Sequence, residues 1–172
     1  RNAALLARAS LGRNEPDASR TQAAGATPRA ALASRRMDLR KLLPEAIPGP
    51  AALLYSLVPG NFGRPAQRRL AELAAQALPD SARVVLDVGC GPGWLAIELA
   101  RRRPELRVVA VDLSATMVRI ARFNARGMSN LEVRNENAAE LSAPDASIDW
   151  VVSAESMHHW RNPVAVLDEF HR

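Results

Sequence analysis

The sequence predicts an α/β fold in which a parallel sheet carries helices on both faces. Short apolar runs alternate with helix-like segments from Arg83 onward. The apolar runs are continuous, which is typical of strands that are buried on both faces. Strand–helix repetition of this kind specifies a parallel sheet with right-handed crossovers.

Before this region the chain divides into two further parts. Residues 1–36 are rich in Ala and Arg, contain no aromatic residue and are broken by Gly and Pro, so we expect a disordered or upstream extension. An organelle transit peptide is the alternative, because Arg-rich and acid-poor segments suit that role. Residues 37–82 are expected to form an N-terminal helical segment. Its apolar patch at 51–58 predicts a short helix, and Tyr55 within that patch is a candidate lid residue.

The elements can be placed in order. The first long helix is expected from Pro65, which suits a first helical turn, with apolar residues at helical spacing up to Leu78. Strands are expected at 83–88, 107–112, 131–135 and 147–153.

Helices should connect most of these strands. The helix after the first strand is expected from about Trp94 to Arg103, and the next from after Ser114 to a stop at Gly127. A polar connection follows the third strand, and a helix beginning at Asn162-Pro163 follows the fourth. Residues 83–172 therefore form the expected core.

Composition restricts the class of protein. A chain of 172 residues suits one domain, and no apolar run is long enough to span a membrane. The net charge of +5 resides in residues 1–36, since the remainder is neutral, so no basic face indicates nucleic-acid binding. The single cysteine, Cys90, excludes an internal disulfide and a cysteine-based zinc site, and fits a reducing, cytoplasmic location. Targeting to an organelle by residues 1–36 stays open.

The segment DVGCGPG at 87–93 lies where the first strand ends and a helix begins. It lacks the Lys and hydroxyl residues of a phosphate-binding P-loop. A dinucleotide fingerprint requires a sixth-position glycine, and Trp94 stands there. Asp112 ends the second strand, where a carboxylate can accept hydrogen bonds from both ribose hydroxyls. These features favour an adenosine ligand without a phosphate on the sugar.

Three segments, VLDVGCGPG, VVAVDLS and NAAELSAPDASIDWVVSAESMHHW, resemble the motifs of class I S-adenosylmethionine-dependent methyltransferases, in particular the ubiquinone/menaquinone group. The resemblance implies a Rossmann-like fold of seven strands in the order 3-2-1-4-5-7-6. Only strands one to four are recognised here, so we expect a C-terminally truncated chain, and the sequence does not determine whether it is active. The fourth strand would then be a long apolar edge, which favours aggregation or pairing with another chain.

The resemblance also implies a set of cofactor-binding residues. Asp87 would order the glycine loop near the amino end of S-adenosyl-L-methionine, Asp112 would bind its ribose, and Leu113 would pack beside the adenine. Asn137 stands where the family has an Asp that accepts from the adenine amino group, and an amide oxygen accepts that bond without charge assistance. The remaining cofactor-binding candidates are Gly89, Cys90, Gly91, Gly93, Ala138 and Ser153. The acidic side chains Asp87, Asp112 and Glu155 suit a ligand with a sulfonium and an ammonium group.

The function implied by the resemblance is methyl transfer to a small-molecule acceptor by direct displacement, with no metal ion. His158 is the candidate general base, since a neutral imidazole can take a proton from an acceptor. The alternative is that one residue of the His158–His159 pair packs and caps while the other is solvated. A non-catalytic S-adenosylmethionine-binding module and a nicotinamide-dependent oxidoreductase are the alternative functions. The sequence does not specify the oligomeric state.

Overall fold

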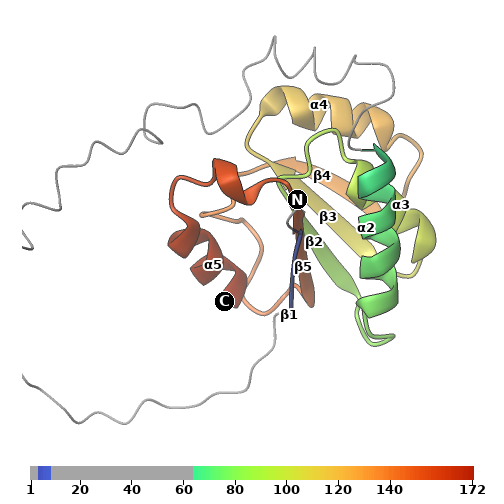
Figure 1. The fold of residues 1–172 in the computed structure, drawn as a ribbon, viewed down its shortest axis with the longest axis horizontal. Coiled ribbons are helices and arrows are strands. Elements are labelled where there is room, and N and C mark those ends of the chain that lie inside the picture. The colour runs from blue at the N-terminus through green and yellow to red at the C-terminus, as the bar shows by residue number, and fades with distance from the viewer. Residues whose placement is uncertain (1–3, 9–63) are drawn as a thin grey trace, which may run out of the picture. The chain divides into compact units, whose positions relative to one another are not determined.

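The computed structural model describes the backbone of residues 4–8 and the whole of residues 64–172. The expected apolar helix at 51–58 and the candidate lid residue Tyr55 lie outside these residues. The described part contains a five-stranded sheet in the order β1-β5-β2-β3-β4, with helices on either side (Figure 1).

Four strands run parallel, as the sequence predicts. They are β2 (Val84–Val88), β3 (Arg107–Asp112), β4 (Leu131–Asn135) and β5 (Trp150–Ala154). The central strand β2 pairs with β3 on one side and with β5 on the other, and β4 pairs with β3. The carboxyl ends of β2, β3 and β5 therefore meet at one edge of the sheet, where α/β proteins bind their ligands.

The strands lie close to their expected positions. β3 and β4 begin and end where predicted, and β2 begins one residue later. β5 begins at Trp150, three residues after the expected start. The reason lies in Asp149, whose carboxylate accepts hydrogen bonds from the backbone N–H groups of Arg83 and Val84, both at 2.8 Å. The Asp149 carboxylate thus takes the hydrogen bonds of two N–H groups that would otherwise pair with the backbone of a longer β5.

The helices also follow the expected pattern. They are α2 (Arg64–Ala77), α3 (Trp94–Arg102), α4 (Ala115–Asn124) and α5 (Pro163–His171), with a short 3-10 helix, η3 (Met157–His159), that was not predicted. Ser114 caps α4 by accepting from the N–H of Met117, and Asn162 caps α5 by accepting from that of Ala165. α4 ends three residues before Gly127, the expected stop. None of the helices in the described residues is long and apolar enough to cross a membrane.

Two apolar layers hold the sheet. Alternate strand residues point to opposite faces: Val85, Val108 and Val152 join the cluster formed with α2, α3 and α4, whereas Leu86, Val109 and Val151 pack with α5. Figure 1 shows α5 on the opposite side of the sheet from α2 and α3. Both faces are covered, which explains why the strands read as continuous apolar runs.

The outer edge of β5 is not free, which contradicts the expectation of an exposed apolar edge. Strand β1 (Ala4–Arg8) pairs with β5 in an antiparallel register from Ala4 opposite Ala154 to Arg8 opposite Trp150. The sequence analysis predicts no element in this segment. Five residues of β1 therefore cover the edge with main-chain pairing.

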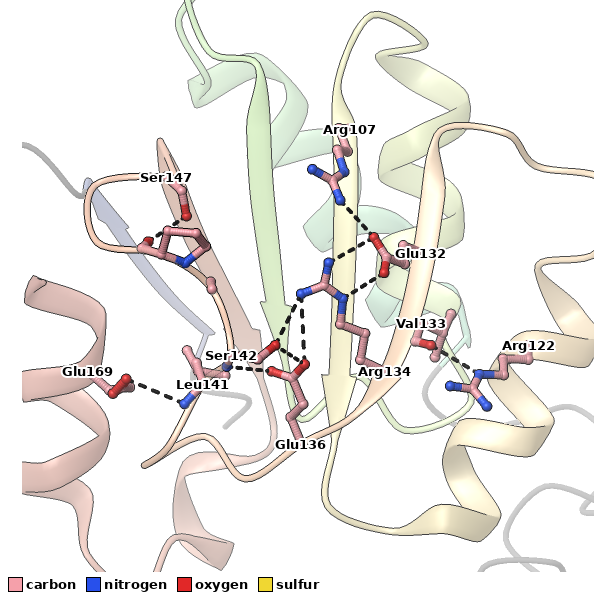
Figure 2. A network of polar contacts seen from close by, with 12 residues as sticks. Arg107, Arg122, Glu132, Val133, Arg134, Glu136, Leu141, Ser142, Ser147 and Glu169 are labelled. Carbon is pink, nitrogen blue, oxygen red and sulfur yellow. Dashed lines mark hydrogen bonds and ion pairs between the residues drawn. The ribbon is translucent and has the colours of Figure 1, made fainter.

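The opposite edge strand, β4, carries charged side chains. Glu132 bridges Arg107 of β3, at 2.9 Å, and Arg134, at 2.7 Å, and the hydrogen bonds from these two guanidinium groups, Arg134 first, lower the pKa of Glu132 to about 2. Glu136 accepts from the Ser142 hydroxyl at 2.6 Å and from the Ser142 N–H at 3.2 Å (Figure 2). The network continues from the strand into the polar connection and fixes its course, and charged edge residues also discourage pairing with other chains.

Candidate functional site

The loop from Gly89 to Gly93 forms the floor of the candidate site, between the end of β2 and the start of α3. The N–H groups of Gly89 and Cys90 both donate to the carbonyl of Val111, at 2.9 and 3.0 Å, which ties the loop to β3. The N–H of Gly93 donates to the carbonyl of Cys90 at 2.9 Å. The three glycines have φ values of 71°, 53° and 83°, a region that residues with a side chain rarely adopt.

The three glycines face different surroundings. A Cβ atom on Gly89 would lie 2.2 Å from the Cβ of Ser156, and one on Gly93 would lie 3.1 Å from the Cβ of Ala121 in α4. A Cβ on Gly91 would meet nothing within 4 Å. The missing side chains of Gly89 and Gly93 thus leave space that other residues of the protein occupy, whereas the space beside Gly91 is free.

Asp112, at the end of β3, lies directly against this loop. Its Oδ2 accepts from the N–H of Gly91 and its Oδ1 from the N–H of Ser114, each at 2.8 Å. Burial raises the pKa of Asp112, and these two hydrogen bonds, together with the charge of His159, oppose that rise. Each carboxylate oxygen can accept a further hydrogen bond, so the anchored side chain can still accept two from a diol.

Asp87 is the most buried acidic group of the site, with 1% of its surface exposed. Its Oδ2 is buried and has no hydrogen-bond partner. Burial raises the pKa of Asp87 to about 7, the charge of Asp112 adds to the effect, and a hydrogen bond from the N–H of Ala96 opposes it. An unpaired buried acceptor of this kind is costly unless a ligand satisfies it.

Cys90 has a structural environment within the loop. Its side chain is buried, and its Sγ lies 3.7 Å from the carbonyl oxygen of Gly91. Burial raises the pKa of the Cys90 thiol well above its usual value, and the charges of Asp87 and Asp112 add to this. The thiolate is the nucleophilic form of cysteine, so Cys90 is not activated for nucleophilic attack.

The end of β5 and the residues that follow it approach the glycine loop from the side opposite β3. Ser153 and Ser156 are both buried, and both hydroxyls contact the carbonyl of Val88, at 3.0 and 3.1 Å. Between the two serines, Glu155 has a φ of 57°, an uncommon value for a residue with a side chain. The Ser153 hydroxyl, one of the predicted cofactor contacts, is thus engaged with the end of β2.

The two histidines of η3 differ in their neighbours. Their ring centroids are 4.0 Å apart and both residues are exposed. Partial burial of its ring and the charge of His158 lower the pKa of His159, whereas the carboxylate of Asp112 opposes this. The pKa of His159 therefore depends on Asp112, a coupling that the sequence does not reveal.

The remaining predicted cofactor residues follow β3 and β4. Leu113 is 39% exposed beside Asp112. Asn137 accepts from the N–H of Ala139 at 3.0 Å through Oδ1, within its own turn, and Ala138 packs against the apolar layer that includes α5. The described hydrogen bonds thus join Asp112 to the glycine loop and leave Asn137 in a separate turn.

The sequence analysis did not identify two contributors to this site, Asn135 and Ser156, and it considered His159 only as the neighbour of His158. Asn135, the last residue of β4, donates through Nδ2 to the carbonyls of Asp112 and Leu113 at 2.8 and 3.0 Å. Its position could have indicated a role for Asn135, because it is a polar residue at the carboxyl end of a predicted strand. Ser156 had no such signal, because its role depends on contact with Gly89. Among the side chains that the structure describes, no group of three or more His, Cys, Asp or Glu could hold a metal ion.

Known proteins are similar to this chain in sequence. A release factor glutamine methyltransferase from Mycolicibacterium smegmatis is 40% identical over 131 residues, which cover 72% of this chain and 44% of that protein. A demethylmenaquinone methyltransferase from Deinococcus radiodurans is 40% identical over 101 residues, covering 58% of this chain and 42% of that protein. The chain thus spans less than half the length of these curated relatives.

Solved structures agree on the fold. A SAM-dependent methyltransferase from Aquifex aeolicus superposes with a TM-score of 0.53 at 23% identity, over 64% of this chain and 66% of that one. The [4+2]-cyclase SpnF superposes with a TM-score of 0.52 at 28% identity, over 59% of this chain and 39% of that one. The family model described as a methyltransferase domain matches residues 85–172, and the chain therefore belongs to the methyltransferase domain family.

Proposed function

We propose that this protein is an S-adenosylmethionine-dependent methyltransferase that acts on a small-molecule acceptor. The observation that carries the proposal is the junction of Asp112 with Gly91, where a partly buried carboxylate anchors the one loop glycine that opens onto free space. A carboxylate at the end of this strand suits a ribose diol.

The residues of the site fit the charge of this cofactor. The unpaired Oδ2 of Asp87 offers an acceptor to an ammonium group, and the remaining lone pairs of Asp112 offer acceptors to two hydroxyls. Two neighbouring carboxylates whose burial raises the pKa of each would gain from a cationic ligand, since an opposite charge favours their ionised forms. A diphosphate would meet an unfavourable field at the same place.

When bound, S-adenosylmethionine supplies an electrophilic methyl group on its sulfonium. The protein's own part is to bind and orient the two reactants and to exclude water from between them. We propose His158 as the general base and retain His159 as the alternative, because the carboxylate of Asp112 raises the pKa of His159. A neutral imidazole of either residue can accept one proton from the acceptor.

The names of the relatives guide the choice of acceptor. Demethylmenaquinone methyltransferases from two organisms match at 40% and 36% identity, which supports a small-molecule acceptor here. The release factor glutamine methyltransferase covers more of this chain and makes a protein glutamine the competing acceptor. The resemblance to a [4+2]-cyclase shows that one fold carries different activities.

Calorimetric titration of the 172-residue chain with S-adenosylhomocysteine, S-adenosylmethionine and NAD⁺ tests the cofactor. We expect binding of the first two and none of NAD⁺. Asp112→Ala should weaken binding at least tenfold, whereas Asp168→Asn, an exposed carboxylate of α5, should leave it unchanged. Binding of NAD⁺ alone would contradict the proposal.

The acceptor is tested with a radiolabelled methyl group. Label should move from S-adenosylmethionine to a demethylmenaquinone analogue and not to a release-factor peptide. Transfer only to the peptide would replace the acceptor class. Cofactor binding without transfer to either would favour the binding-module alternative.

A further inference from the structure

The carbonyl of Val88 marks the place where β2 and β5 separate. Their parallel ladder extends from Val85 opposite Trp150 to Asp87 opposite Val152. Beyond that pair, the hydroxyls of Ser153 and Ser156 contact the Val88 carbonyl, at 3.0 and 3.1 Å. Beyond the last backbone pair, the hydrogen bonds between the two strands are thus made by the side chains of two serines.

The two hydroxyls also contact each other, with their Oγ atoms 2.6 Å apart. Each hydroxyl has a single proton to donate, so the two protons serve three contacts. The short Oγ–Oγ distance favours a chain in which one serine donates to the other and the second donates to Val88. Both serines are buried, and buried polar groups that satisfy one another in this way specify a single arrangement.

Ser156 makes a second, steric contact that Ser153 does not make. Its Cβ fills the space where Gly89 lacks a side chain, with 2.2 Å between that Cβ and the one that an alanine would bring. The carbonyl of Ser156 accepts from the N–H of His159 at 2.9 Å, which closes the turn of η3. Ser156 therefore joins the glycine loop directly to the turn that carries both histidines.

We propose that Ser156 is a positioning residue for methyl transfer, which holds the turn of His158 and His159 at a fixed place relative to the cofactor loop. The role of these histidines toward an acceptor rests on the proposed function, whereas the contact itself does not. Glu155, with its φ of 57°, turns the chain at the end of β5 so that Ser156 meets Gly89. Without the Ser156 contact, the turn would lose its connection to Val88 and Gly89.

The experiment reads the position of His159 from its response to Asp112. The imidazole titration of His159 is followed by NMR in the 172-residue chain, with and without Asp112→Asn. Because the Asp112 carboxylate raises the pKa of His159, the substitution should lower it. The size of that shift reports how closely the turn approaches β3. The comparison is repeated in Ser156→Gly, Ser156→Ala and Ser153→Ala.

We expect Ser156→Gly to reduce the Asp112-dependent shift by at least half, with Ser156→Ala intermediate. Ser153→Ala is the matched control, because it removes a hydroxyl from the same carbonyl without touching Gly89. It should retain the shift while lowering the melting temperature about as much as Ser156→Ala, by roughly 2–4 °C. The proposal is overturned if the shift persists in both Ser156 variants or falls equally in Ser153→Ala.

Binding of S-adenosylhomocysteine to the same proteins separates this inference from the proposed function. No binding by the unsubstituted chain would remove the proposed function and leave the NMR comparison interpretable. Normal binding together with an unchanged shift in the Ser156 variants would retain the function and remove the positioning role.

Discussion

At the scale of single residues, Asp87 of the proposed binding site carries a cost to stability. Its side chain is 1% exposed, and one of its oxygens has no partner. The charge of Asp112 disfavours the ionised form of Asp87, and a hydrogen bond from the N–H of Ala96 stabilises it. A buried carboxylate with so little compensation is destabilising in the absence of a ligand.

This residue predicts a pH dependence of stability. The folded-state pKa of Asp87 is raised from 3.8 to about 7, so the folded state holds a proton that the unfolded chain has released. The stability contributed by this proton is present at low pH, is lost between about pH 4 and 7, and changes no further above pH 7. Asp87→Asn should remove this dependence. Between pH 5 and pH 8 the unsubstituted chain should therefore lose roughly 2–3 kcal/mol of unfolding free energy that the variant does not lose.

Urea unfolding at several pH values between 5 and 8 measures this difference. The same variant should bind S-adenosylhomocysteine at least tenfold more weakly at pH 8, because an amide provides no charge for the ligand's ammonium group. A parallel pH dependence in Asp87→Asn and the unsubstituted chain would show that Asp87 does not carry the effect.

At the scale of elements, the connection between β2 and α3 depends on packing as much as on backbone conformation. Gly89 and Gly91 both have positive φ values, 71° and 53°, yet Ser156 contacts the open face of Gly89 and nothing occupies that of Gly91. Both positions therefore require a left-handed backbone, and only Gly89 also lacks room for a side chain. Substitutions at the two positions can thus distinguish backbone strain from steric overlap.

Gly89→Ala should cost about 2–4 kcal/mol of unfolding free energy, because left-handed strain of about 1 kcal/mol is combined with overlap against Ser156. Ser156→Gly should relieve the overlap, so the double variant should be less destabilised than the sum of the single variants by at least about 1 kcal/mol. Gly91→Ala is the control and should show strain alone with no coupling to Ser156. Urea unfolding of the variants measures the cycle, and additive effects at Gly89 would argue against the contact.

At the scale of the whole molecule, two different features of the sheet protect its β4 side and its β5 side from pairing with other chains. Charged side chains of β4 protect one edge, through the network of Glu132 and Arg134. Strand β1 covers the other by pairing with all five residues of β5. β5 is an almost wholly buried, mainly apolar strand, so loss of β1 should expose an edge prone to self-association.

Removal of residues 1–8 should therefore lower the unfolding free energy by roughly 1–3 kcal/mol, through the lost main-chain pairing, and should increase association. Removal of residues 1–3 alone, which precede the strand, is the control and should have neither effect. Chemical unfolding and light scattering at several protein concentrations provide the measurements. Equal behaviour of the two truncated chains would show that β1 does not protect the edge.

Local features of the sequence determined the four parallel strands, the order of the helices, and the loop and carboxylate at the carboxyl end of β2 and β3. These depend on apolar periodicity, on caps such as Ser114 and Asn162, and on glycines that adopt positive φ, all of which act within a few residues. The same rules placed β3 and β4 without error. They also drew attention to Asp112 before any neighbour was known.

The tertiary structure alone decided which residues meet across the sheet. Ser156 lies 67 positions after Gly89, and β1 pairs with a strand more than 140 residues later. His159 of η3 lies far along the chain from Asp112 of β3, whose charge affects its pKa. None of these contacts has a local pattern, because each depends on where two separately formed elements come to lie. The free lone pairs of Asp112 and the unpaired oxygen of Asp87 likewise became visible only when their hydrogen-bond partners could be identified.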